Sequence, residues 1–193
     1  MKVNRLSFTM EASAFLGFVA AIAATSLASS AEPAAPVSTH MRISCGGDAC
    51  GDYAADNYFH GGFTFAEKWP IKKPADDLTP DSVYQHERYG GNFSYSIPVP
   101  SLPEGKHFRV RLHFAELSNT APDKRLENIS INGQVVLSNF DVFKEAGSNN
   151  TAVIKEFDTI SPGKDGTVKI DISVIPGHDD ASAEINGIEI LGP

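Results

Sequence analysis

Apolar and polar residues alternate along much of the chain after residue 40, a pattern typical of strands that turn one face towards a core. The clearest run spans residues 107–114. The alternation predicts a strand with one buried face and one solvated face. The apolar positions of this run are Phe108, Val110, Leu112 and Phe114, and the polar positions are His107, Arg109, Arg111 and His113.

Two other segments carry the same period of two. Residues 93–99 alternate apolar and polar positions, and residues 167–175 do so again. Residues 183–191 are predicted to form the last strand, with Ile188 and Ile190 on one side. No segment after residue 31 keeps an apolar period of 3.6 over ten or more residues, although residues 138–147 fit a short helical turn.

A hairpin turn is predicted at Asn132-Gly133, which stands between two β-branched runs in the segment 129–137. Both residue types tolerate positive φ, so this pair is a strong signal for a two-residue turn between antiparallel strands. Strands of this length, separated by Gly, Pro and Asn, indicate an all-β fold, specifically an antiparallel β-sandwich.

The segment 82–91 precedes the strand of residues 93–99 and has a different character. Tyr84 and Tyr89 bracket four polar or charged residues, including Glu87 and Arg88, and two glycines follow. The segment is predicted to be a loop that enters the strand.

The first 31 residues have the order of a secretory signal peptide. Lys2 and Arg5 precede an apolar run and then small residues, with cleavage expected after Ala31. The alternative is an uncleaved membrane anchor, for which the run is short. Residues 32–40 are interpreted as a linker and residues 41–193 as one domain, with no membrane span in the processed chain.

The charge balance argues against nucleic acid as a partner. The chain has 24 acidic and 16 basic residues and a formal net charge of −8, which repels a phosphate backbone. Cys45 and Cys50, the two cysteines, are predicted to close a small disulfide in an oxidising compartment, the alternative being two free thiols. A metal site is not predicted, because the six histidines are scattered.

Sequence motifs of catalysis are missing from the chain. It contains no G-x-S-x-G, no H-E-x-x-H, no phosphate-binding glycine loop and no dinucleotide fingerprint. Acidic residues such as Asp56, Glu116 and Asp180 could converge as a glycosidase pair, but their spacing does not indicate it. We therefore expect no enzyme activity, no catalytic residue and no cofactor.

Several motifs together resemble the malectin domain family. In order, the chain reads RISCGG, YAADNYFHGG, VYQHERYGGNFSYSIPVP, VRLHFAEL, ISINGQVVLSNFDVFKEAG and INGIEIL, near the spacing of that family from about residue 41 to 191. The resemblance implies a β-sandwich of the jelly-roll or galactose-binding-like type. It also implies a carbohydrate site, since the best understood members bind glucose-containing oligosaccharides such as glucosyl-α-1,3-glucose.

The resemblance carries over to some site residues and not to others. Tyr89 matches the family's tyrosine in the ERY segment, and Phe65 falls on a family tyrosine after the Gly-Gly loop, with Trp69 nearby. The family's aromatic pair after FAE falls on Ser118 and Asn119, so two stacking rings are missing. The residues predicted to contact sugar, including neighbours of these positions, are Phe65, Trp69, Tyr84, Glu87, Arg88, Tyr89, Asn119 and Asp180, the last with a one-residue shift.

Structural alternatives exist for three of these residues: Tyr84 is equally a core residue, and Glu87 and Arg88 equally shape the loop. The function that follows is a secreted, non-catalytic lectin-like domain for an oligosaccharide or glycan. The alternative is an interaction module of the same fold that binds protein or peptide. Its location is expected to be extracytoplasmic, meaning periplasm, cell surface or endoplasmic reticulum lumen.

Overall fold

The computed structural model describes residues 39–193. The predicted signal peptide and all but the last two residues of the predicted linker lie outside the described residues. The first strand begins at His40, one residue before the expected start of the domain.

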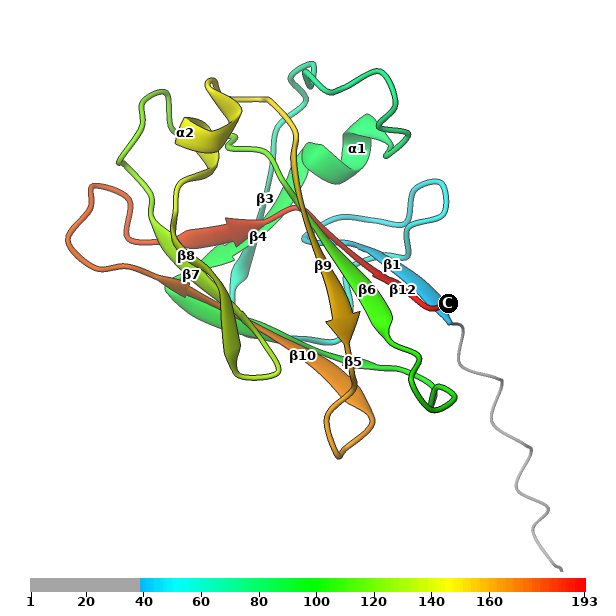
Figure 1. The fold of residues 1–193 in the computed structure, drawn as a ribbon. Coiled ribbons are helices and arrows are strands. Elements are labelled where there is room, and N and C mark those ends of the chain that lie inside the picture. Colours follow the sequence, from blue (N-terminus) through cyan, green and yellow to red (C-terminus); the bar gives the residue numbers. More distant parts are fainter. Residues whose placement is uncertain (1–38) are drawn as a thin grey trace, which may run out of the picture. The chain divides into compact units, whose positions relative to one another are not determined.

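Two antiparallel sheets face each other and enclose the main core (Figure 1). Antiparallel pairing throughout confirms the predicted all-β sandwich. The four-stranded sheet has the order β1 (His40–Ser44), β12 (Gly187–Leu191), β6 (Phe108–Phe114) and β9 (Val153–Ile160). The five-stranded sheet has the order β2 (Phe59–His60), β5 (Asn92–Pro98), β10 (Thr167–Val174), β7 (Glu127–Ile131) and β8 (Gln134–Phe140).

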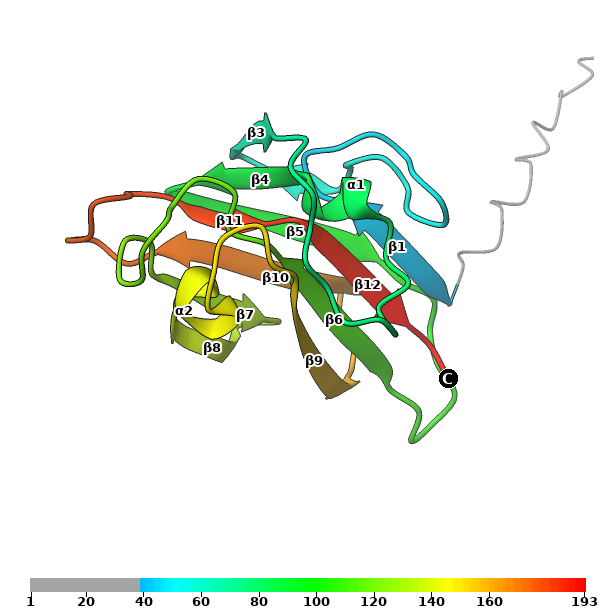
Figure 2. The ribbon, with the colours of Figure 1, turned by 90° about the horizontal axis from the view of Figure 1, so that it is seen from above.

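A smaller sheet of three strands and two short helices complete the described elements. The strand order is β11 (Ala183–Ile185), β4 (His86–Gly90) and β3 (Phe63–Ala66), and the helices are α1 (Asp81–Tyr84) and α2 (Val142–Ala146). Figure 2 shows α1 beside β4. Strands β4 and β11 are thus separated from the main sheets while lying directly next to β5 and β12 in sequence.

The alternating residues build the core as predicted. Phe108, Val110, Leu112 and Phe114 of β6 are almost completely buried, and they pack in one cluster with Ile170 and the other inward residues of β10. Burying each such side chain contributes about 1.5–3 kcal/mol relative to leaving it in water. The sandwich is therefore held mainly by its interior layer.

The predicted turn and helical turn are both confirmed. Asn132 and Gly133 have φ values of 50° and 80°, as a type I′ turn requires, and they join β7 to β8. Helix α2 begins after Asp141, whose carboxylate accepts a hydrogen bond from the Lys144 amide, and ends at Gly147 in the left-handed conformation.

The solvated face predicted for β6 is only partly solvated. His113 points away from the core side yet is completely buried, because Tyr53 and Tyr84 pack against its ring at centroid distances of 5.9 and 5.7 Å. The segment that carries α1 covers this end of the sheet. It approaches closely at Gly187, where an added Cβ would lie 2.7 Å from Val83 Cγ1.

The predicted last strand is two strands in two sheets. It divides at Asn186, whose side chain replaces backbone partners: Oδ1 accepts from the Ala115 amide, and Nδ2 donates to the Tyr84 and His86 carbonyls. The chain thereby leaves the small sheet as β11 and enters the four-stranded sheet as β12.

Candidate functional site

The predicted loop before β5 is instead helix α1 followed by strand β4, which changes how its residues are presented. Tyr89 pairs with Phe63 on β3 and with Glu184 on β11. Residues directly opposite each other in antiparallel strands have side chains on the same face of the sheet. Phe65 is two residues from Phe63 on β3, and Glu87 is two residues from Tyr89 on β4. Phe65 and Glu87 are paired with each other, so they lie on this same face.

One edge of this face is aromatic and open to solvent. Phe63 is 68% exposed, and its ring centroid lies 5.9 Å from that of the half-buried Tyr89. Phe65 is turned inwards and packs on a small cluster that includes Ile71 and Leu117. We name Phe63, Phe65 and Tyr89 the Tyr89 surface.

The other edge of this face holds a buried group of charges around Arg125. Its guanidinium Nε lies 3.0 Å from Asp180 Oδ2 and 3.6 Å from Glu116 Oε2. Its Nη1 contacts the Glu184 carboxylate and lies 3.8 Å from Glu87 Oε1. A further carboxylate, Glu127, accepts a 2.7 Å hydrogen bond from the Glu184 amide. We name these six residues the Arg125 cluster: Glu87, Glu116, Arg125, Glu127, Asp180 and Glu184.

A single guanidinium cannot neutralise five carboxylates in a buried place. Burial raises the pKa of Glu127 to about 8, and the neighbouring acids add to the effect of burial. Burial likewise raises the pKa of Glu184 and of Glu87. Asp180 differs: burial opposes ionisation, but hydrogen bonds from Ser182 and the charge of Arg125 lower its pKa. Asp180 is therefore the ionised partner that faces outwards.

Asn119 and Asp180, both predicted site residues, do meet. Asn119 Nδ2 donates to Asp180 Oδ2 at 3.0 Å and to Glu116 Oε2 at 3.2 Å. Glu116 Oε1 also accepts the backbone amides of Ser118 and Asn119 at 2.9 and 2.8 Å. The buried carboxylate of Glu116 thus shapes the loop that carries the two positions where the aromatic pair is missing.

Three predicted contact residues lie in the interior instead. Tyr84 has no exposed surface, and its hydroxyl donates to Asp77 Oδ2 at 2.7 Å and lies 2.9 Å from His113 Nδ1. Glu87 is buried in the Arg125 cluster, and Arg88 is buried on the opposite face of β4. All three side chains are buried, so none of them is exposed to solvent as a contact residue was expected to be.

Arg88 is held by Asp56, which lies in the segment before β2. Asp56 Oδ2 accepts from Arg88 Nη2 at 2.6 Å and from the Gly46 amide at 2.8 Å, and Oδ1 accepts from Tyr95 OH at 2.9 Å. The Arg88 guanidinium also lies 3.4 Å from the ring centroid of Phe59. Because both carboxylate oxygens of Asp56 accept hydrogen bonds, this ion pair holds the loop before β2 in place.

Trp69 lies in the segment after β3 and is 56% exposed, and its carbonyl accepts from Gln85 Nε2 at 2.9 Å. The predicted disulfide is not formed, since Cys45 and Cys50 are both free thiols. Cys45 directly follows β1 and has its side chain in the main core, where burial raises its pKa, whereas Cys50 lies half-buried at the start of a turn.

Phe63 and Arg125 are the residues of this face that the sequence did not reveal. Phe63 directly follows Gly61-Gly62 and is in phase with Phe65, so its position on the same face was available as a signal. Arg125 gave no signal, because its partners come from four separate segments.

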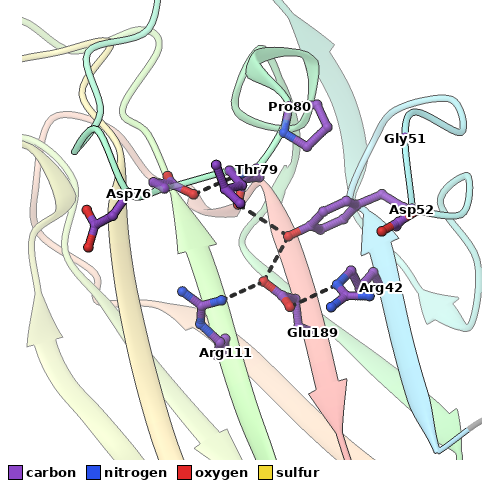
Figure 3. A pocket seen from close by; sticks show the side chains of 11 residues that line it. Arg42, Gly51, Asp52, Asp76, Thr79, Pro80, Arg111 and Glu189 are labelled. Atoms are coloured by element: carbon purple, nitrogen blue, oxygen red, sulfur yellow. Dashed lines mark hydrogen bonds and ion pairs between the residues drawn. The ribbon is translucent and has the colours of Figure 1, made fainter.

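A second polar network lies under a cleft on the outer face of the four-stranded sheet (Figure 3). Glu189 lies between Arg42 and Arg111, which come from the two neighbouring strands. Its carboxylate accepts from Tyr53 OH at 2.9 Å and contacts His113 Nε2 at 2.8 Å. We name this group, Arg42, Tyr53, Arg111, His113 and Glu189, the Glu189 cluster.

Glu189 has the opposite charge environment to the carboxylates around Arg125. Burial opposes its ionisation, but the hydrogen bonds from His113 and Tyr53 and the charge of Arg111 lower its pKa to about 2. Within residues 39–193, no group of three or more His, Cys, Asp and Glu side chains is arranged to hold a metal ion. In the part of the chain that the structure describes, no helix is long and apolar enough to cross a membrane.

Comparison with protein families gives a match over nearly all described residues: the model of the Malectin domain matches residues 39–188. The chain belongs to the malectin domain family. Mouse malectin is 29% identical over 119 residues, which are 58% of this chain and 40% of that protein. A probable receptor-like protein kinase of Arabidopsis thaliana is 37% identical over 59 residues, which are 30% of this chain and 7% of the kinase.

Solved structures resemble this malectin domain in fold. A chain in the crystal structure of the plant peptide RALF23 in complex with FER and LLG2 matches with a TM-score of 0.68 and 22% identity, covering 79% of this chain and 48% of that chain. The ANX2 ectodomain from Arabidopsis thaliana matches with a TM-score of 0.65 and 18% identity, over 79% and 49% of the two chains. The chain thus spans about half the length of these solved structures and 40% or less of the length of the curated relatives.

Proposed function

We propose that this malectin domain is a non-catalytic carbohydrate-binding module that recognises glucose-containing oligosaccharides through the Tyr89 surface. The observation that carries the proposal is the pairing of Phe63 and Tyr89 at the exposed edge of the small sheet. Sugar rings offer flat C–H faces, for which aromatic rings are suited, and a set of hydroxyls.

Polar groups next to this edge supply the second requirement. Tyr89 is directly opposite Glu184, which is bound to Arg125, and Arg125 in turn holds Asp180. Asp180 and Asn119 form the outward part of that chain of contacts. Because the pKa of Asp180 is lowered, it is an ionised acceptor for hydroxyl groups at neutral pH.

The structure favours Phe63, in place of the expected Phe65, as the aromatic residue that faces the ligand. Phe65 is directed into a small apolar cluster, whereas Phe63 is exposed next to Tyr89. We therefore assign the main stacking contacts to Phe63 and Tyr89, with Phe65 as the support beneath them. Ser118 and Asn119 provide no ring, so we expect weaker binding than in family members that have both.

Isothermal titration calorimetry with glucosyl-α-1,3-glucose and longer glucans tests this proposal. Tyr89→Ala and Phe63→Ala are each expected to raise Kd by about tenfold, as loss of one aromatic contact implies. Val135→Ala is the matched control, because Val135 is exposed on a different sheet, and it should leave Kd unchanged. Absence of binding to every glycan on an array, by protein with a folded circular dichroism spectrum, would refute the proposal.

The second candidate function is binding of protein or peptide by the same surface. Two observations favour it: the aromatic pair is missing at Ser118 and Asn119, and a fold relative is found in a complex with the peptide RALF23. A negative glycan array combined with a protein partner whose binding is lost in Phe63→Ala would support this candidate over the first.

We also propose that the domain is exported and that residues 1–31 are removed. The order of charged, apolar and small residues supports this processing. Mass spectrometry of the protein from its native source is expected to find an N-terminus at Glu32. A mature chain that starts at Met1 and stays in the membrane fraction would contradict it.

A further inference from the structure

A row of alternating charges crosses the outer face of the four-stranded sheet. Arg42 on β1 is paired with Glu189 on β12, Glu189 with Arg111 on β6, and Arg111 with Glu156 on β9. The side chains of directly opposed residues point to the same face. The row is therefore a polar floor that lies outside the core.

The acceptors of Glu189 are already in use. Oε2 accepts from Arg42 Nε at 3.0 Å, and Oε1 accepts from Arg111 Nη1 at 3.1 Å as well as from Tyr53 and His113. This buried carboxylate cannot itself bind a ligand. It fixes the orientation of the guanidinium groups of Arg42 and Arg111, whose side chains are 31% and 30% exposed.

The two arginines keep donors for something else. Among the described residues, Nη1 and Nη2 of Arg42 and Nη2 of Arg111 have no hydrogen-bond partner. Guanidinium N–H groups are strong donors in a fixed planar arrangement. The floor thus offers several oriented donors above a rigid sheet.

Two loops stand as walls above this floor and enclose a cleft of about 470 Å³ (Figure 3). One loop contributes Gly51 to Tyr53 and the other Asp76 to Pro80. The loops touch, since a Cβ on Gly51 would lie 3.1 Å from Pro80 Cγ. A cleft of this size is within the range of small-molecule sites, about 300–1,000 Å³.

The walls supply acceptors and an apolar surface. Asp52 and Asp76 are exposed, and within residues 39–193 their carboxylates have no hydrogen-bond partner. Leu78 is 90% exposed at the rim, while Tyr53 and Pro80 give the wall carbon surface. Donors on the floor therefore face acceptors on the walls.

The balance of charge decides which ligand fits. Two arginines and four acidic residues line the cleft, so an anion would be repelled by the walls. A cation would meet the two guanidinium groups on the floor. A neutral ligand that both donates and accepts hydrogen bonds avoids both costs, and hydroxyl groups do both.

We propose that this cleft is a second carbohydrate-binding site, for a neutral sugar of one or two rings. It shares no residue with the Tyr89 surface and does not depend on the function proposed there. The hydroxyls of the sugar would accept from Arg42 and Arg111 and donate to Asp52 and Asp76. Leu78 would cover one carbohydrate face.

Nuclear magnetic resonance titration of the domain with glucose, maltose and glucosyl-α-1,3-glucose tests the site. Saturable shifts of the Nε–Hε signals of Arg42 and Arg111 are expected. The double substitution Asp52→Ala with Asp76→Ala should raise the Kd obtained from these shifts by at least about tenfold, as the loss of hydrogen bonds to charged groups implies. Because both residues are exposed, the fold should be retained.

Two control variants separate this site from the other. Glu104→Ala removes an exposed acidic residue that does not line the cleft, and it should change nothing. Tyr89→Ala should leave the arginine shifts intact while weakening binding at the Tyr89 surface by about tenfold. Loss of the arginine shifts in Tyr89→Ala would show one site only and would overturn the proposal.

The choice of ligand class is tested by charged probes. Galacturonic acid and glucosamine are titrated beside the neutral sugars. Shifts of Arg42 and Arg111 that arise only with galacturonic acid, or only with glucosamine, would overturn the neutral class. Absence of arginine shifts with any of these sugars would overturn the site itself.

Discussion

The Arg125 cluster and the Glu189 cluster have opposite charge compositions. In the first, one buried arginine faces five carboxylates, and three of those carboxyl groups, Glu87, Glu127 and Glu184, have raised pKa values. In the second, one buried carboxylate is surrounded by two arginines, a histidine and a tyrosine hydroxyl, and its pKa is lowered to about 2. The acids around Arg125 lie deeper than Glu189 and share one cation, so desolvation determines the direction of the pKa shift in the first cluster, and hydrogen bonds and positive charge determine it in the second.

This difference gives the two clusters opposite dependences on pH. A carboxyl group with a lowered pKa in the native state stabilises the fold above the pKa of the unfolded chain, about 4.3 for glutamate. A carboxyl group with a raised pKa binds a proton in the native state that the unfolded chain has already lost, so stability falls as pH rises through that interval. Substitutions in each cluster should reveal these signs.

Arg125→Met is expected to have the largest effect. It leaves several buried carboxylates without a cation, which costs about 3–5 kcal/mol of unfolding free energy at pH 7. The loss should be smaller at pH 5, because the unpaired carboxyl groups can then be protonated. Urea unfolding followed by circular dichroism measures both values.

Arg109→Met is the matched control for that substitution. Arg109 is half exposed and pairs with Asp158 on the surface of β6 and β9, so its loss should cost much less unfolding free energy than the loss of Arg125. Equal losses for the two variants would mean that Arg125 is not the centre of a buried charge cluster.

Glu189→Gln should be next, with a loss of about 2–3 kcal/mol at pH 7. Glutamine keeps one acceptor but removes the charge that orients Arg42 and Arg111. Since the pKa of Glu189 is about 2 in the native state, its contribution is present above pH 4.3 and disappears as pH falls towards 2. The difference in unfolding free energy between variant and wild type should therefore be large at pH 7 and small at pH 2.5. A difference that does not depend on pH would contradict the lowered pKa of Glu189.

Glu127→Gln should act in the opposite direction. The native pKa of Glu127 is about 8, so the wild type loses stability between about pH 4.3 and pH 8. Glutamine resembles the protonated form and can still accept from the Glu184 amide. We expect the variant to be more stable by up to about 5 kcal/mol at pH 9 and equal at pH 4.5, as measured in thermal melts. Destabilisation by the substitution at pH 9 would contradict a raised pKa of Glu127 in the native state.

The alternating pattern was sufficient to predict much of the sandwich. The run of residues 107–114 contains β6, and Asn132-Gly133 forms the predicted turn between β7 and β8, because both depend on local chemistry. His113 was assigned to solvent because the pattern says nothing of a distant segment that folds over the sheet. Residues 86–90 were predicted to be a loop, because the buried positions of this strand include charged residues and therefore show no apolar alternation.

The candidate site was predictable only in part. Tyr89 and Phe65 do lie on one face of the small sheet, and Asn119 does meet Asp180. The Arg125 cluster was not predicted, because its members meet only through tertiary folding. One signal was present: Glu127 is in phase with Ile129 and Ile131, which are buried, so a charged residue was already placed on a core face.

Gly187 gives the proposed cleft a control point outside its lining. An added methyl group there would collide with Val83 of α1, at 2.7 Å, while the pairing of β12 with β6 would hold the floor in place. The helix and the Asp76–Pro80 wall that precedes it would have to move outwards. A Gly187→Ala variant therefore offers a way to alter the cleft without changing any group that would touch the ligand.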